Sequence, residues 1–172
     1  MRLAVIAFSL ALLGAPAFAQ QHDAAVCAAM DASLPADMAD WNGGTAIATA
    51  TGPEHAAHVS LALGKGYAAE LKRKGEVTFS VAPEKPGGSV SYSGLFSFTI
   101  REAGNYSVAL GSAAWIDVLE DGKALAPASF GHGPECTTIR KKVVFALKPG
   151  LHVLQVAGNG AQTLKLMVAK AS

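Results

Sequence analysis

From residue 45 onward, apolar and polar side chains alternate over short segments, and glycine, proline or asparagine separates most of these segments. In "LFSFTI", for example, Phe96, Phe98 and Ile100 fall on one face and the residues between them on the other. This period of two is typical of strands that bury one face. No long stretch after Thr45 repeats apolar residues at helical spacing. The pattern therefore excludes a helical bundle and predicts strands.

Turn signals set the spacing of these predicted strands. Asp121-Gly122 and Asn159-Gly160 are dipeptides that favour two-residue β-hairpins. Roughly eight to ten short strands with turns between them are typical of sandwiches and jelly rolls. We therefore predict an all-β fold, an antiparallel β-sandwich of the jelly-roll kind, over residues 45–172.

The region before the strands is different in composition. Residues 20–44 are rich in alanine, and "SLPADMADW" offers Ser33 as a helix cap and Pro35 in the first turn. Met38 and Trp41 lie three residues apart and can share one face of a helical turn. Gly43 and Gly44 end the segment. We expect a short helical segment at 20–44, attached to the β domain.

The first 19 residues have the form of a secretory signal peptide. Arg2 precedes an apolar run that is too short to cross a bilayer, and Ala17-Phe18-Ala19 fits the small-x-small cleavage pattern. No later run is long and apolar enough for a transmembrane segment. We expect cleavage after Ala19 and a periplasmic or secreted protein.

The cysteines and the charge fit this interpretation. Only Cys27 and Cys136 are present, and a cysteine pair in an exported chain favours a disulfide over a zinc site, which needs closer pairs. The 14 basic residues include Arg2, so those beyond the predicted signal peptide balance the 13 acidic ones. A chain without excess positive charge is not expected to bind nucleic acid.

The C-terminal half resembles small jelly-roll modules of secreted bacterial proteins. The relevant segments are "GLFSFTIREAGNYSVAL", "WIDVLEDGKAL" and "VVFALKPGLHVLQVAG", which run from strand to turn to strand over residues 94–168. The modules with this rhythm include pre-peptidase C-terminal domains and carbohydrate-binding modules. The resemblance implies a fold and does not specify an activity.

The chain also looks like small exported chains that carry a homogentisate dioxygenase label. That resemblance would imply Fe²⁺ held in a cupin-type site by two histidines and a glutamate. This sequence lacks the His-x-His pair of a cupin and offers instead His55 and His58 in "PEHAAH", with His132 and Glu135 in "HGPE". These four residues are the alternative metal site, although solvent-exposed loop histidines explain the same pattern.

No catalytic residues are expected. The chain has no Gly-x-Ser-x-Gly nucleophile motif, and a disulfide would remove Cys136 as a nucleophile beside His132. Glu120 and Asp121 form a predicted hairpin tip, which is a poor place for a buried catalytic acid.

A binding face is the better candidate. Alternation in "AAWIDVLE" puts Trp115 and Asp117 on the face opposite the core, although Trp115 could itself be a core residue. An aromatic ring beside a carboxylate suits a sugar, which offers a C–H face and hydroxyl donors. The "GHGPE" loop follows the same hairpin, so we add His132 and Glu135 to Trp115 and Asp117 as the candidate binding site.

These observations favour one class of function over two others. We expect a non-catalytic binding or accessory protein without a cofactor, whose partner is a glycan or an envelope component. The alternatives are a small iron-dependent dioxygenase and a purely structural envelope protein. The sequence leaves the ligand and the oligomeric state open.

Overall fold

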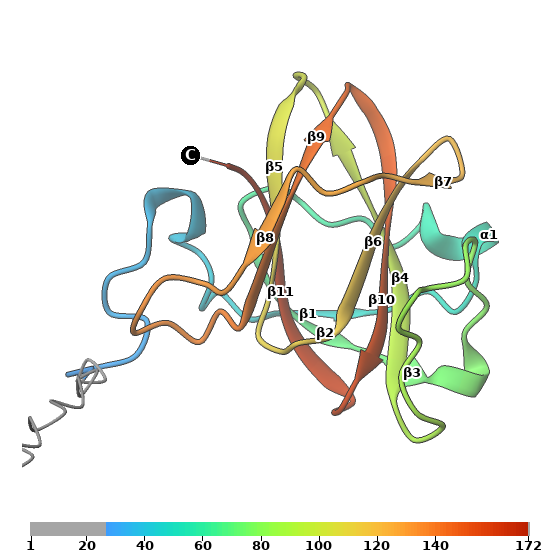
Figure 1. The fold of residues 1–172 in the computed structure, drawn as a ribbon, viewed down its shortest axis with the longest axis horizontal. Coiled ribbons are helices and arrows are strands. Elements are labelled where there is room, and N and C mark those ends of the chain that lie inside the picture. The colour runs from blue at the N-terminus through green and yellow to red at the C-terminus, as the bar shows by residue number, and fades with distance from the viewer. Residues whose placement is uncertain (1–26, 172) are drawn as a thin grey trace, which may run out of the picture.

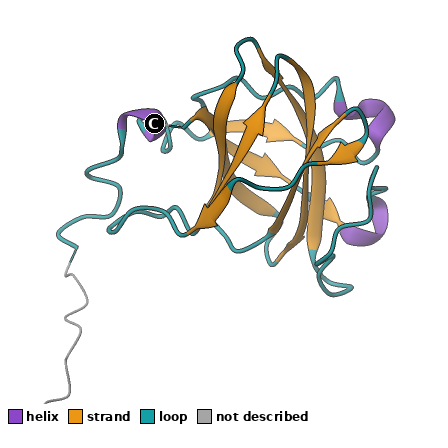
Figure 2. Cartoon of the chain, turned by 45° about the horizontal axis from the view of Figure 1, so that its top comes forward, coloured by secondary structure: helices purple, strands orange, loops and turns teal. Residues whose placement is uncertain are grey.

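The computed structural model describes residues 27–171, so the predicted signal peptide lies outside the described residues. Two β-sheets face each other, and the helical turns lie outside them (Figures 1 and 2). The helical elements are η1 (Ala36–Met38), α1 (Pro53–Ala56) and η2 (Lys74–Glu76). The strands are β1 (Thr45–Ala48), β2 (Gly66–Glu70), β3 (Lys72–Arg73), β4 (Tyr92–Ile100), β5 (Gly104–Leu110), β6 (Trp115–Glu120), β7 (Lys123–Ala124), β8 (Ser129–Gly131), β9 (Lys141–Leu147), β10 (Gly150–Asn159) and β11 (Thr163–Lys170).

The strand order is that of a jelly roll. Sheet A has the order β1-β2-β11-β5-β9-β8, and sheet B has the order β3-β4-β10-β6-β7. When the edge strands β1, β3 and β8 are left out, each strand lies in the opposite sheet from the strand before it in sequence. The one exception is the hairpin of β6 and β7, which lie in the same sheet. Neighbouring strands are antiparallel, apart from the parallel pair β1–β2 at one edge. The predicted all-β sandwich of the jelly-roll kind is confirmed.

The main core lies between the two sheets, where the predicted alternation placed it. The inward side chains of the long strands, including Phe96, Phe98, Phe145, Leu154 and Leu166, are buried there. Each buried aliphatic or aromatic side chain contributes roughly 1.5–3 kcal/mol by leaving water. This layer therefore provides the main driving force for folding.

The outer faces of both sheets are also covered. Met38, the last residue of η1, and Trp41 pack with Ile139 on outward residues of β5 and β11. On sheet B, Leu95 packs with Ala50 and Ala56 from the segment around α1. This double coverage explains why several polar residues of the strands are buried, among them Ser97, Ser107 and Gln155.

One local prediction was wrong, and one segment with alternating apolar residues is not a strand. Asn159-Gly160 does not form a hairpin, because β10 and β11 belong to different sheets; the buried Asn159 side chain instead accepts a hydrogen bond from Ser112 and donates one to the Ala161 carbonyl. The alternating segment "EVTFSV" (76–81) does not form a strand. Its last backbone groups bond to the Gln155 side chain rather than to a neighbouring strand.

The hairpin at Asp121-Gly122 forms as predicted. Glu120 pairs with Lys123 across it, and both central residues have positive φ, 51° at Asp121 and 74° at Gly122. This is the conformation that two-residue hairpin turns favour, because its twist matches that of the strands. None of the helices within the described part of the chain is long and apolar enough to cross a membrane.

Candidate functional site

The Trp115 and Asp117 side chains lie together on the outer face of β6. Residues two apart in a strand share a face, and Ile116 between them points into the core. The Trp115 Nε1–H donates a hydrogen bond of 2.9 Å to Oδ1 of Asp117. Both side chains are half-buried. The structure therefore brings together the aromatic ring and the carboxylate that the sequence proposed.

A cavity of about 530 Å³ opens beside this pair. Part of its lining comes from the segment that runs from the two-residue strand β7 to β8, and Figure 1 shows the course of this segment. Leu125 and Pro127 of this segment, together with Phe130 of β8, supply an apolar wall. Glu84, Lys85 and Lys141 complete the polar side. The short edge strand thus leaves room for a ligand of a few rings.

Two lysines flank the Trp115 ring. The Nζ atoms of Lys85 and of Lys141 each lie 5.4 Å from the ring centroid, within the range of cation–π attraction. Lys141 is also held by a hydrogen bond of 2.9 Å from its Nζ to the Ala114 carbonyl. Two ammonium groups thus lie at the ring, in a cavity that Glu84 and Asp117 also line.

The ionisable groups of the site are perturbed by burial. Burial raises the pKa of Asp117, hydrogen bonding from Trp115 and the nearby Gln155 amide offsets part of this effect, and the charge of Glu84 raises the pKa further. Burial lowers the pKa of Lys141, and the positive charge of Lys85 adds to this. Oδ2 of Asp117 is buried and has no hydrogen-bond partner within residues 27–171. A buried acceptor without a partner is costly, so a ligand hydroxyl that reached it would relieve that cost.

The loop that carries Glu84 and Lys85 is fixed on sheet B. Oε1 of the buried Gln155 accepts hydrogen bonds from the N–H groups of Ser80 and Val81, at 2.7 Å and 3.3 Å, and its Nε2 donates to the Val81 carbonyl. Gly87 follows at a φ of +75°, and a Cβ there would lie 2.5 Å from Cα of Gly158. Both the conformation and the close approach require glycine. The loop that brings Glu84 and Lys85 to the cavity is therefore fixed on both sides of Lys85.

The structure does not bring His132 and Glu135 into this cavity. Both side chains are exposed, neither lines the cavity, and Nδ1 of His132 lies 3.1 Å from the Arg140 carbonyl oxygen. Phe130, at the start of the same "FGHGPEC" stretch, is the residue that does line it. Its side chain is 79% exposed, which is unusual for a large apolar residue.

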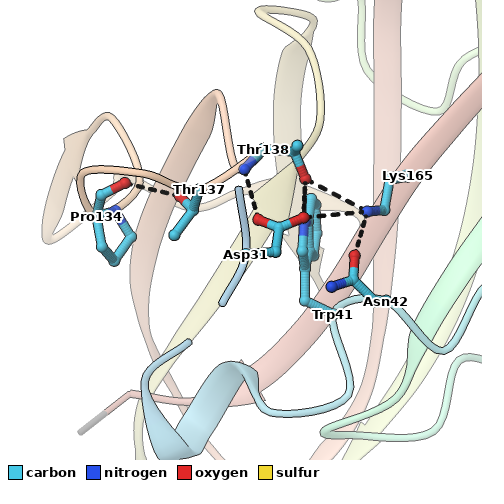
Figure 3. A network of polar contacts seen from close by, with 7 residues as sticks. All are labelled: Asp31, Trp41, Asn42, Pro134, Thr137, Thr138 and Lys165. Atoms are coloured by element: carbon cyan, nitrogen blue, oxygen red, sulfur yellow. Dashed lines mark hydrogen bonds and ion pairs between the residues drawn. The ribbon is translucent and has the colours of Figure 1, made fainter. Parts of the chain in front are cut away.

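The rest of that stretch is tied to the N-terminal segment. Cys136 forms the predicted disulfide with Cys27, which is confirmed. Close by, the almost fully buried Asp31 carboxylate accepts hydrogen bonds of 2.6 Å from both the N–H and the hydroxyl of Thr138 (Figure 3). Lys165 lies 3.7 Å from the same carboxylate, and Trp41 donates to the Thr138 hydroxyl. These contacts assign the loop a structural role.

Burial alone would raise the pKa of Asp31. The hydrogen bonds from the side chain and backbone of Thr138, with the charge of Lys165, outweigh that effect and hold the pKa below its ordinary value. Asp31 thus stays ionised and keeps both hydrogen bonds at neutral pH.

The four residues of the alternative metal site do not come together. His55 and His58 lie at α1, on the opposite side of the sandwich from the loop after β8 that carries His132 and Glu135 (Figure 1). His55 is exposed and contacts Glu54 at 3.0 Å. Between residues 27 and 171, no group of three or more histidine, cysteine, aspartate or glutamate side chains could hold a metal ion. The residues present do not fit an iron site of the cupin type.

Lys85, Lys141 and Phe130 are the site residues that sequence reasoning missed. Lys141 belongs to the basic run 140–142, which has the appearance of a solvated strand end, and Lys85 belongs to a loop without a motif. Lys141 reaches Trp115 because of the register of β9, and Lys85 reaches it because the 82–88 loop packs on sheet B. For Phe130, the sequence offered one signal, which is that a large aromatic residue lies between a polar and a glycine-rich segment.

Comparisons with known proteins place the chain in no family. No family model matches it, and no curated protein matches it either. One solved structure, the pre-peptidase C-terminal domain of a collagenase from Bacillus anthracis, overlaps with 48% of this chain and 81% of its own. The sequence identity is 20% and the TM-score is 0.35, so this overlap carries no argument about activity. The homogentisate dioxygenase resemblance receives no support from these comparisons.

Proposed function

We propose that this chain is an exported, non-catalytic binding protein that holds a glycan in the cavity beside Trp115. The observation that carries the proposal is the pairing of a half-buried Trp115 with Asp117 at the rim of that cavity. An aromatic face packs against the C–H face of a sugar, and a carboxylate accepts hydrogen bonds from its hydroxyl groups.

The other features of the site support binding rather than catalysis. Asp117 and Glu84 share the cavity with two lysines, but no serine, cysteine or threonine nucleophile lines it. The apolar wall of Leu125, Pro127 and Phe130 can pack against a ligand and exclude water from it. An accessory role in the cell envelope is the biological setting that we propose.

Export is supported by two independent features. The first 19 residues have the composition of a secretory signal peptide, and the Cys27–Cys136 disulfide is of a kind that persists in oxidising compartments. We therefore place the protein in the periplasm or outside the cell.

A glycan array with the purified oxidised protein tests this proposal. The wild type should bind at least one class of oligosaccharide, and Trp115→Ala should lose that binding by tenfold or more, as expected for an aromatic anchor. Phe79→Leu is a matched control, because Phe79 is an aromatic residue that packs away from the cavity. The absence of any oligosaccharide binding at millimolar concentration, or unchanged binding by Trp115→Ala, would contradict the proposal.

A further inference from the structure

The lysines at the cavity differ from most other lysines of the fold. Lys72, Lys142, Lys148, Lys165 and Lys170 each lie within 4.0 Å of a carboxylate oxygen. Lys85 and Lys141 form no ion pair within residues 27–171, although both lie at Trp115 and Lys141 is half-buried. A partly buried ammonium group without an anionic partner is an unfavourable arrangement unless something else supplies the charge.

The Asp117 carboxylate at the same cavity has an acceptor that the described residues leave unused. Asp117 uses Oδ1 to accept from Trp115, and its Oδ2 is left without a partner in the described chain. The cavity therefore presents, around one aromatic ring, two ammonium groups without an ion pair and one carboxylate oxygen without a hydrogen-bond partner among the described residues. Two ammonium groups can take an anionic acceptor, and one carboxylate oxygen can take a hydroxyl donor.

From this arrangement we infer that the ligand is a carboxylated carbohydrate, of which a uronic acid residue is the simplest form. This inference rests on the glycan-binding function proposed above and specifies its ligand class. The sugar carboxylate lies toward Lys85 and Lys141, and a ring hydroxyl donates to Oδ2 of Asp117. A single molecule that carries both an anion and hydroxyl groups satisfies both kinds of group at once.

The charge of the site favours a carboxylate over a more highly charged anion. Asp117 and Glu84 also line the cavity, so a doubly charged phosphate would be repelled more strongly than a singly charged carboxylate. The wall of Leu125, Pro127 and Phe130 gives the C–H face of a second sugar ring a surface to pack on. The site therefore fits a short acidic oligosaccharide better than a free inorganic anion.

Calorimetric titration of the oxidised protein with a uronate oligosaccharide and with its carboxyl-reduced, neutral counterpart tests the inference. The two ligands share one sugar skeleton and differ only in charge. The acidic form should bind at least tenfold more tightly in buffer of low ionic strength. Lys141→Gln and Lys85→Gln should each reduce that preference severalfold, and added salt should weaken the binding of the acidic form.

Lys65→Gln is the matched control for total charge, because Lys65 is exposed and does not line the cavity. It should leave the preference unchanged. Equal affinity for the acidic and neutral forms would overturn the inference while leaving glycan binding intact, whereas no binding of either form would contradict the proposed function as well. Tighter binding of a sulfated oligosaccharide than of the uronate would overturn the choice of carboxylate. If all three lysine variants reduced the preference for the acidic form equally, that preference would reflect non-specific charge attraction, and the inference would be overturned.

Discussion

The indole N–H of Trp115 donates to Oδ1 of Asp117, two residues along the same strand, and leaves Oδ2 of that carboxylate buried without a partner in the described chain. The ring is thereby held at a fixed angle to the strand, since its one polar atom is used within the protein. The remaining oxygen stays available to a ligand. This relationship gives the cavity beside β6 both a rigid aromatic surface and an unused acceptor.

Asp117→Asn should change how the stability of the fold depends on pH. Because the fold raises the pKa of Asp117 above its ordinary value of 3.8, the native state binds this proton more tightly than the unfolded chain does. Its contribution therefore falls as the pH rises from 3.8 through the folded pKa. Urea unfolding across this range should show the variant gaining stability relative to the wild type with rising pH, and a constant difference would contradict the raised pKa.

Gln155→Leu should release the loop that carries Lys85. The substitution removes three hydrogen bonds to the backbone of Ser80 and Val81, and we expect a loss of about 1–3 kcal/mol in the free energy of unfolding. Gln162→Leu is the control, because the exposed Gln162 side chain forms one hydrogen bond within residues 27–171, to Glu70, and its loss should cost less than about 0.5 kcal/mol. Amide hydrogen exchange at Ser80 that is no faster in Gln155→Leu than in the wild type would contradict this anchoring role.

Asp31→Ala should destabilise the protein by about 2 kcal/mol, because it leaves the Thr138 N–H and the Lys165 ammonium without their buried acceptor. The fold lowers the pKa of Asp31, so its contribution is present above pH 3.8 and is lost as the pH falls through the folded pKa. Urea unfolding at neutral pH measures the cost.

Glu102→Ala is the matched control for Asp31→Ala. It breaks an exposed ion pair with Lys170 and should cost much less than Asp31→Ala does, because water screens the attraction between exposed charges. Equal costs for the two variants would show that the contacts around Asp31 contribute no more than a surface ion pair does.

Replacing both cysteines by serine should be the most destabilising of these changes. The disulfide links residues 109 apart, and the chain-entropy model gives about 4.7 kcal/mol for a loop of about 100 residues. Thiol titration of the oxidised protein in denaturant should find no reactive thiol. Two reactive thiols before reduction would contradict the disulfide, and an unchanged urea midpoint in the double variant would contradict its stabilising role.

The sequence predicted the elements whose pattern is local. Alternation identified the inward faces of the long strands, and Asp121-Gly122 marked a hairpin because both residues tolerate positive φ. Asn159-Gly160 has the same local signature, yet its strands separate into different sheets. That outcome depends on the buried side chain of Asn159 and on long-range pairing, which a dipeptide does not encode.

The site was predictable only in part for the same reason. Trp115 and Asp117 are neighbours on one strand, so strand periodicity was enough to place them together. Lys85 and Lys141 come from a loop and from the other sheet, 56 residues apart in sequence. His132 and Glu135 were expected near the cavity because their loop follows the hairpin, but the contacts around Asp31 and the disulfide hold that loop elsewhere.

The two tryptophans allow the central claim to be tested in one spectrum. Trp115 borders the cavity, whereas Trp41 of the N-terminal segment is fully buried and donates to Thr138. Titration of ¹⁵N-labelled protein with a uronate oligosaccharide, followed by NMR of the two indole N–H signals, should shift the Trp115 signal and leave the Trp41 signal in place. A titration that moves neither signal, or moves only that of Trp41, would contradict a binding site beside Trp115.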